Sequence, residues 1–235
     1  MALYAIGDLH LSLTADKPMD VFGGAWEGYV DKIRAGLSIL TPADTLILCG
    51  DTSWGMTLAE ALADFRFIDA FPGEKWLVKG NHDYWWTTKS KMTRFFEEHH
   101  IHSLNILQNT AIVREGKILC ATRGWFDVEE GQEPQDEKVL KRECGRLVMS
   151  LEEGKKLGSG DIYCFLHYPP LYEGYRCEPI WHILKEYHVT RCYYGHLHGH
   201  ACRRRLEGDQ QGIALRLISA DHIHFKPLLC GGDAD

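Results

Sequence analysis

Short apolar runs that end in a potential metal ligand recur along this chain. The runs are typical of buried strands and span residues 3–7, 45–49, 75–79, 162–166 and 192–194. The polar pieces that follow them are Asp8-Leu9-His10, Gly50-Asp51, Gly80-Asn81-His82-Asp83, His167 and Gly195-His196-Leu197-His198. Each piece places a hard or borderline ligand at the end of a predicted strand. Together they predict a hydrolytic site that holds two metal ions.

The types of ligand in these pieces indicate which metals the site would take. Carboxylate and amide oxygens beside neutral imidazoles suit divalent ions such as Mn, Fe or Zn, and no cysteine occurs in any piece. Asp8 and Asp51 cancel only about two of the four positive charges of two divalent ions, so the occupied centre would attract a phosphate and acidify a bound water. With ions about 3.5–4 Å apart, we expect Asp51 and a hydroxide to bridge them.

Glycines accompany the ligands at positions 7, 50, 80 and 195. Glycine is favoured where a strand must turn sharply or where the backbone must come close to another group. We therefore expect compact ligand loops.

These pieces, in this order, resemble the calcineurin-like metallophosphoesterase superfamily. Its pattern is Asp-x-His, Gly-Asp, Gly-Asn-His-Asp/Glu, a lone His and Gly-His-x-His, and every element is present between Asp8 and His198. The resemblance implies an α/β fold, a four-layer αββα sandwich of two mixed β-sheets flanked by helices, with the ligands on loops at one edge. It also implies a single metallophosphoesterase domain over residues 1–235.

The resemblance further implies a role for each site residue. One ion would be held by Asp8, His10, Asp51 and His198, and the other by Asp51, Asn81, His167 and His196. Mn is the expected metal for both positions, with Fe or Zn as alternatives. His82 would be a catalytic residue that protonates the leaving oxygen or steadies the transition state, and Asp83 would orient it.

Several alternatives compete with this interpretation. Among 13 histidines, a single one is more often a surface or core residue than a ligand. We give that reading to His99, His100, His102, His182, His188, His200, His222 and His224. A non-catalytic scaffold could also retain the fold, although no ligand is replaced here. A nuclease of the same superfamily is the second enzymatic alternative.

The expected reaction is hydrolysis of a phosphate ester, with a phosphodiester and a small phosphomonoester both compatible. The superfamily's protein phosphatases have an Asp-Arg-Gly segment after the bridging aspartate and a glutamate after the Asn-His pair. This chain has Thr52-Ser53-Trp54-Gly55 and Asp83 at those places, which counts against a phosphoprotein substrate.

Four residues near the predicted metal loops are candidates for substrate binding. Trp54, Trp85 and Trp125 could form a wall on which a flat group stacks. Any single one of them is more typical of loop packing, but we expect at least one of the aromatic side chains near the metal loops to face the substrate. Arg123 could hold a phosphate oxygen, or it could be an ordinary surface cation.

Composition limits the partners and the compartment. The 235 residues, of which 45% are hydrophobic, can bury a core without disulfides, and the net charge of −7 disfavours a surface that tracks nucleic acid. The one basic cluster, Arg203-Arg204-Arg205, falls in a predicted strand. The eight cysteines show no close pairing and no secretory signal is present, so we expect a reduced, cytoplasmic protein. We expect a small phosphorylated substrate, no membrane association and no evident protein partner.

The remaining elements follow from periodicity and turn residues. Predicted helices span 26–40, 57–70, 87–100, 135–156 and 179–187. Successive strands at 104–107, 111–113 and 118–121 predict antiparallel pairing, and segments 201–206 and 213–219 predict a hairpin about Gly208-Asp209.

Overall fold

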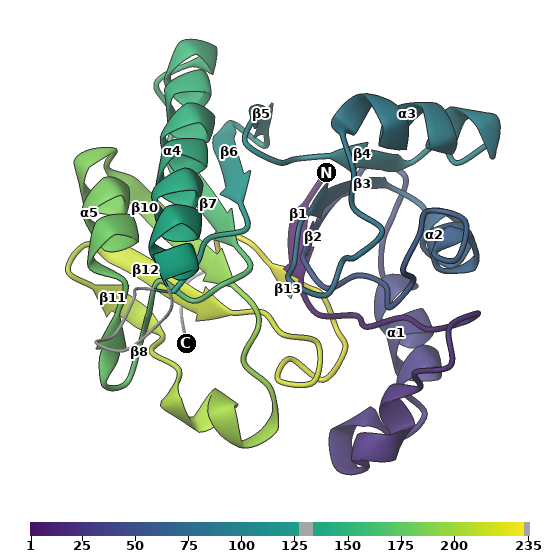
Figure 1. Cartoon of the computed structure of the whole chain (residues 1–235). Helices are drawn as coiled ribbons and strands as arrows, with labels where there is room; N and C mark the ends of the chain where they lie inside the picture. Colours follow the sequence, from purple (N-terminus) through teal and green to yellow (C-terminus); the bar gives the residue numbers. More distant parts are fainter. Residues whose placement is uncertain (127–133, 233–235) are drawn as a thin grey trace.

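The computed structural model describes residues 1–126 and 134–232 and shows two mixed β-sheets packed face to face between two layers of helices (Figure 1). In Figure 1 the helices α1, α2 and α3 cover the outer face of one sheet, and α4 and α5 cover the outer face of the other. The expected four-layer αββα sandwich is confirmed.

The first sheet takes four of its five strands from the N-terminal half of the chain. Its strand order is β13-β1-β2-β3-β4. Strands β1 (Leu3–Ile6), β2 (Thr45–Cys49), β3 (Glu74–Val78) and β4 (Leu104–Ile106) are parallel, and β13 (Leu228–Leu229) adds to β1 in the antiparallel sense. The connecting helices are α1 (Tyr29–Leu37), α2 (Leu62–Asp69) and α3 (Lys89–Glu98).

The second sheet has the order β11-β12-β10-β7-β6-β5. Strands β6 (Lys117–Thr122), β7 (Ile162–Leu166), β10 (Val189–Tyr194) and β12 (Ile213–Leu217) are parallel, whereas β5 (Ala111–Arg114) and β11 (Gly208–Gln210) form antiparallel edges. Helices α4 (Pro134–Leu157) and α5 (Glu178–Glu186) pack on it. A separate ribbon pairs β8 (Leu171–Tyr172) with β9 (Tyr175–Arg176).

Three hydrophobic clusters separate the layers. The central one joins side chains of both sheets, such as Ile47 and Val78 from the first and Leu119 and Phe165 from the second. The other two lie between each sheet and its own helices. Every residue of β2 and of β7 is buried, as expected for parallel strands covered on both faces.

Several predicted elements differ from the structure. Helix α1 begins at Tyr29, because residues 19–22 and 24–26 form short 3-10 turns around Gly23 and Gly24, which have left-handed φ angles. The predicted helix 57–70 is helical only from Leu62, after a turn in which the Thr57 hydroxyl accepts from the Glu60 backbone N–H at 3.2 Å.

Two predicted strand pairings are wrong. Strand β4 lies parallel to β3 in the first sheet, and the chain then crosses to the second sheet, where only β5 and β6 form the expected antiparallel pair. The segment predicted as a strand at 201–206 is largely the 3-10 helix η3 (Gly199–Arg204). The hairpin joins β11 and β12 through Gln211 and Gly212, whose φ angles of 56° and 89° suit a tight turn of that kind.

Two expectations from composition concern the cysteines, which were expected to be reduced, and the absence of membrane association. Within the described ranges no disulfide is formed, in keeping with the expectation from spacing. No helix in the described part of the chain combines the length and the apolar character that crossing a bilayer requires.

Candidate metal centre

The five predicted ligand pieces meet at one edge of the sandwich. The pieces after β1, β2 and β3 come from the first sheet, and those after β7 and β10 come from the second. Parallel strands end at a common edge, and the face-to-face packing brings the two edges together. The Asp8 backbone N–H donates to the Gly50 carbonyl at 2.9 Å, and the Gly195 N–H donates to the His167 carbonyl at 3.1 Å, which ties neighbouring loops together.

Four ligand residues have left-handed backbone conformations. The φ angles are 60° at Asp8, 46° at His10, 49° at Asp51 and 71° at His196. Residues other than glycine rarely adopt this region, and each such residue costs roughly 1–3 kcal/mol. The fold therefore holds these side chains in place at an energetic cost, as functional sites often do.

The glycines allow the loops to approach closely. A Cβ atom on Gly80 would overlap the Asp51 carboxylate, and one on Gly195 would overlap the Asp8 carboxylate. A Cβ on Gly50 would lie 2.5 Å from Nδ1 of His167. The expectation of compact ligand loops is confirmed at these three positions.

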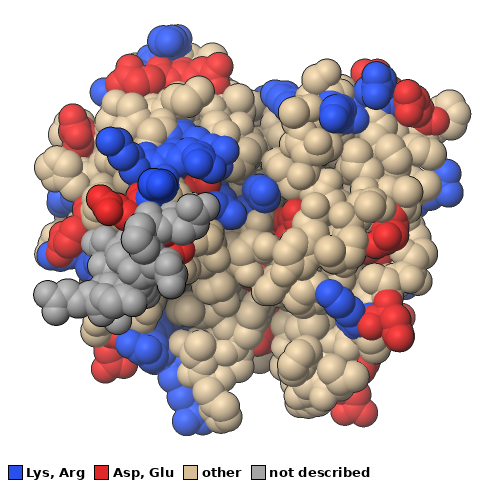
Figure 2. Space-filling view, in the orientation of Figure 1, with Lys and Arg blue, Asp and Glu red and all other residues tan. Residues whose placement is uncertain are grey.

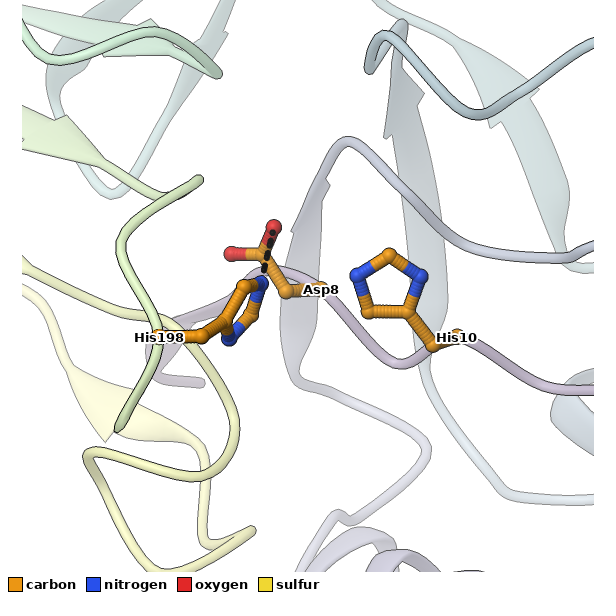
Figure 3. A group of neighbouring side chains, drawn as sticks. All are labelled: Asp8, His10 and His198. Atoms are coloured by element: carbon orange, nitrogen blue, oxygen red, sulfur yellow. Dashed lines mark ion pairs between the residues drawn. The ribbon is translucent and has the colours of Figure 1, made fainter. Parts of the chain in front are cut away.

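One group of ligand atoms comes from Asp8, His10 and His198, all within 4.8 Å of one another. Nε2 of His198 lies 3.4 Å from Oδ1 of Asp8. Figure 3 shows the His198 ring directed at the Asp8 carboxylate from a separate loop, with the His10 ring on the same loop as Asp8.

A second group comes from Asp8, Asp51 and His167, again within 4.8 Å. The Asn81 side-chain oxygen joins this group, 2.6 Å from Nε2 of His167 and 3.0 Å from Nδ1 of His196. The structure therefore brings all seven predicted ligand side chains together.

Asp8 belongs to both groups, and Asp51, a member of the second group, also lies close to the first. Its Oδ2 is 3.7 Å from Nε2 of His10 and 3.4 Å from Nε2 of His167. Its Oδ1 accepts a hydrogen bond from the His82 backbone N–H at 2.7 Å. One oxygen is thus fixed by the protein, while the other lies near a histidine of each group.

Two buried polar atoms of the centre have no hydrogen-bond partner in the described part of the chain. They are Oδ2 of Asp51 and Nε2 of His198. Buried polar atoms are nearly always partnered in native proteins. A bound divalent cation would satisfy both, so the donor set fits the metal that the sequence predicts.

The electrostatics of the protein alone agree with a site built for cations. Burial and the neighbouring Asp8 charge raise the pKa of Asp51 to about 8. For Asp8 burial acts in the same direction, but His198, His167 and His10 outweigh it and hold its pKa below the usual range. Two buried carboxylates this close repel each other, and positive charge between them would relieve that repulsion.

The histidines divide into neutral and charged forms. Burial lowers the pKa of His196 to about 3 and also lowers the pKa of His10 and His167. For His198 burial likewise lowers the pKa, but Asp8 and Asp221 outweigh it and raise the pKa to about 10. Neutral imidazole is the form that binds a metal, so the site holds several ligands ready for one.

His82 lies at the rim of the centre. Its Nδ1 is 3.2 Å from the Tyr84 hydroxyl, and its ring centroid is 4.5 Å from that of Trp54. Burial and the neighbouring His167 lower its pKa. It belongs to neither group of ligand atoms, in keeping with its predicted place outside the metal ligands.

The prediction that Asp83 orients the His82 ring is wrong. The buried Asp83 carboxylate accepts backbone hydrogen bonds from Asp51 at 3.0 Å, Thr52 at 2.8 Å and Gly80 at 2.7 Å. It also accepts from Nε1 of Trp85 at 3.1 Å. Asp83 therefore fastens two ligand loops to each other, and the Tyr84 hydroxyl is the polar partner of the His82 ring.

The four substrate-binding candidates have different surroundings. Trp54 stacks on His10 with ring centroids 4.9 Å apart and lines a cavity of about 680 Å³ with Trp26, His82 and His198. Trp85 is only 2% exposed and packs in the core, so its prediction as a substrate contact is wrong.

Arg123 and Trp125 interact with each other outside that cavity. The Arg123 guanidinium pairs with Glu143 at 3.0 Å and lies 4.4 Å from the Trp125 ring centroid. Trp125 in turn packs on Tyr168 with centroids 5.0 Å apart. Arg123 is thus already engaged by a carboxylate.

Asp221 and Trp26 are two residues of the site that were not predicted from the sequence. Asp221 is 7% exposed, and its Oδ1 lies 2.9 Å from Nδ1 of His198. It follows the predicted strand 213–219 as the ligands follow theirs, so the same signal could have located it. Trp26 lies 5.6 Å from the His198 ring, centroid to centroid, but its position in a predicted helix gave no sign of this.

Comparison with known proteins identifies the family to which the chain belongs. The family model described as calcineurin-like phosphoesterase matches residues 1–200. The chain belongs to this family. Among curated proteins, none matches it.

Two solved structures share the fold. The protein of unknown function AQ665 from Aquifex aeolicus is 17% identical, with 97% of this chain and 95% of that one covered and a TM-score of 0.51. The protein TT1561 of Thermus thermophilus is 15% identical, with 83% and 81% covered and a TM-score of 0.50. At these identities the likeness concerns the fold alone.

Proposed function

We propose that this calcineurin-like phosphoesterase uses two divalent metal ions, with Mn expected, to hydrolyse a small phosphate ester. The observation that carries the proposal is the position of Asp51, whose unpartnered Oδ2 faces His10 on one side and His167 on the other. A carboxylate between two sets of ligands is what a pair of neighbouring ions requires.

Different residues of the chain would have different roles in this reaction. Asp8, His10, Asp51 and His198 would hold one ion, and Asp51, Asn81, His167 and His196 the other. When bound, the ions would supply Lewis acidity toward the phosphate and a nucleophile derived from water. Asp83 keeps the Asp51 and Gly80 loops at a fixed separation through its hydrogen bonds to both. Such positioning limits the reorganisation needed during the reaction.

His82 is placed to assist departure of the leaving group. Its backbone is anchored on Asp51, and its ring lines the same cavity as Trp26 and Trp54. A ring held at the rim can donate a proton or a hydrogen bond to an oxygen that leaves toward the cavity. The Tyr84 hydroxyl limits rotation of this ring.

The cavity favours a small organic leaving group. Its walls include Met19, Phe22, Trp26 and Trp54, which offer apolar surface beside the ligand atoms of His10 and His198. Such walls suit a flat or apolar portion of an ester. Both a phosphodiester and a phosphomonoester fit this description.

The test is hydrolysis by protein that has been stripped of metal and reloaded with Mn. We expect turnover of 4-nitrophenyl phosphate or bis(4-nitrophenyl) phosphate that is lost with a chelator and restored by Mn. The ratio of the two rates assigns the protein to monoesters or diesters. A folded protein that binds no divalent ion, or binds two without hydrolysing either ester, would overturn the proposal and favour a scaffold.

A further inference from the structure

A second cavity, of about 410 Å³, lies between the end of β3, the start of α3 and the middle of α4. Its lining includes the cations Lys79, Lys89 and Arg146 together with the polar side chains of Thr88 and Gln108. No aspartate or glutamate is among its lining residues in the described part of the chain. A concave surface lined by cations and neutral polar groups is suited to an anion.

The positive charge around this cavity is only partly balanced. The Glu143 carboxylate contacts the guanidinium of Arg146 at 2.6 Å and that of Arg123 at 3.0 Å, so it serves two cations at once. Lys79 has no carboxylate within ion-pair distance among the described residues. An anion in the cavity would offset this excess.

The start of α3 adds to the positive charge around this cavity. Helix α3 has 10 residues, begins at Lys89 and is capped by Thr88, whose hydroxyl accepts from the Lys91 backbone N–H at 3.4 Å. The first backbone N–H groups of a helix carry partial positive charge. This partial charge has the same sign as the charges of Lys79, Lys89 and Arg146, so it also favours an anion.

The cavity is connected to the metal centre along the sequence, because one of its lining residues directly precedes a ligand loop. Lys79 precedes Gly80 and Asn81, and its backbone N–H is fixed by the side-chain oxygen of Gln108 at 3.0 Å. Figure 2 shows Lys and Arg side chains gathered over α4 and continuing toward the hollow between the two halves of the molecule. The lining of this basic cavity thus includes a residue two positions from the ligand Asn81, whereas the cavity with Trp26 and Trp54 includes the ligands His10 and His198 in its own lining.

We propose that the cavity of Lys79, Lys89 and Arg146 binds a second phosphate group of the substrate. The substrate class is then a small molecule with two phosphate groups, one at the metal centre and one in this basic cavity. The binding of an anion here is independent of catalysis, and only its assignment to the substrate rests on the proposed function.

The first experiment measures binding of inorganic pyrophosphate to the metal-free protein by calorimetry at low salt. The variants are Lys89→Glu and, as matched control, Lys91→Glu, an exposed residue of the same helix outside the cavity. We expect about a tenfold or greater loss of affinity for Lys89→Glu, equivalent to about 1.4 kcal/mol, and less than about a twofold loss for the control. Equal losses in both variants, or no binding by the unaltered protein, would refute the cavity as an anion site.

The second experiment tests whether the bound anion belongs to the substrate. Linear alkanediol bisphosphates of increasing length are compared with the corresponding monophosphates as inhibitors of 4-nitrophenyl phosphate hydrolysis by the Mn-loaded protein. One length should inhibit at least about tenfold better than its monophosphate, and Lys89→Glu should abolish that advantage. If no length does so, the cavity does not serve the substrate. Failure of hydrolysis with intact pyrophosphate binding would instead count against the proposed function.

Discussion

Asp221 accepts a hydrogen bond from Nδ1 of His198 at 2.9 Å, and its second oxygen accepts from the Gly199 backbone N–H at 2.9 Å. A carboxylate can only accept, so the imidazole keeps a proton on Nδ1 and Nε2 is the nitrogen left for a metal. That Nε2 is buried without a hydrogen-bond partner in the described residues, 3.4 Å from Asp8. Asp221 lies beyond the residues that the family model matches.

Replacement of Asp221 by alanine should weaken metal binding at the group of Asp8, His10 and His198. Partners of this kind typically contribute about 10–100-fold to metal affinity. Titration of the metal-free protein with Mn should show one weakened and one retained affinity, and Asp221→Asn, which keeps an acceptor oxygen, should recover part of the loss.

Asp44→Ala is the control for loss of a buried carboxylate. Asp44 is also 7% exposed and accepts from the backbone N–H groups of Ala2 and Thr41, far from the centre in the fold. The Asp44→Ala variant should have a lower melting temperature but unchanged metal affinity. Unaltered Mn affinities in Asp221→Ala would show that His198 does not depend on this contact.

Replacement of Asp51 by asparagine should abolish turnover and weaken both metal affinities. One substitution removes an anionic oxygen that faces His10 and His167 together. The measurement is metal content after dialysis combined with the hydrolysis rate. Two bound ions and normal turnover in this variant would refute the bridging role.

Replacement of His82 by alanine should reduce turnover by about 10²–10⁴-fold, the range typical of a lost general acid. Its ring belongs to neither group of ligand atoms, so metal content should be nearly unchanged. Because good leaving groups need less protonation, the defect should be smaller for 4-nitrophenyl esters than for alkyl esters. Loss of metal in this variant would indicate a ligand or structural role.

Gly80→Ala should impair the site through sterics alone. The added Cβ would overlap the Asp51 carboxylate, so Asp51 or its loop must move and metal affinity should fall. Gly145→Ala in α4 is the contrasting variant, since its Cβ would meet nothing within 4 Å. It should stabilise the protein by up to about 1 kcal/mol through helix propensity. Thermal unfolding and Mn titration distinguish the two; similar affinities in both would contradict the steric argument.

Glu207 should contribute stability that is lost in acid. Burial would raise its pKa, but the neighbouring His222, 3.7 Å away, and the hydrogen-bonded Arg205 outweigh burial and lower the pKa from 4.5 to about 2. Folding therefore favours the ionised form: the contribution is complete above pH 4.5 and disappears as the pH falls toward 2.

The variant Glu207→Gln should melt below the unaltered protein at pH 7, and the difference should shrink by pH 3. Thermal unfolding across that range measures it. A difference that stays constant with pH would mean that packing, rather than charge, explains the effect.

The sequence located the strands that carry the ligands because their signal is local. The bounds predicted for residues 45–49 and 162–166 agree with β2 and β7, which are short apolar runs buried on both faces. The sandwich and the side chains that converge were predicted from the resemblance of the ligand pieces, in their order, to the metallophosphoesterase pattern. Pairing was harder: nothing near residues 104–107 indicates that β4 lies beside β3 rather than β5.

Periodicity by itself located the ligand strands, and the resemblance of the ligand pieces to the metallophosphoesterase pattern predicted the fold class and the seven side chains that meet. Only the tertiary structure decided which groups surround them: Asp83 fastens loops instead of holding His82, Trp85 is buried, and Asp221 reaches His198 from 23 residues away. The reason is physical. Strand formation depends on neighbours along the chain, whereas these contacts depend on how two sheets pack, and that packing is set by all the buried side chains together.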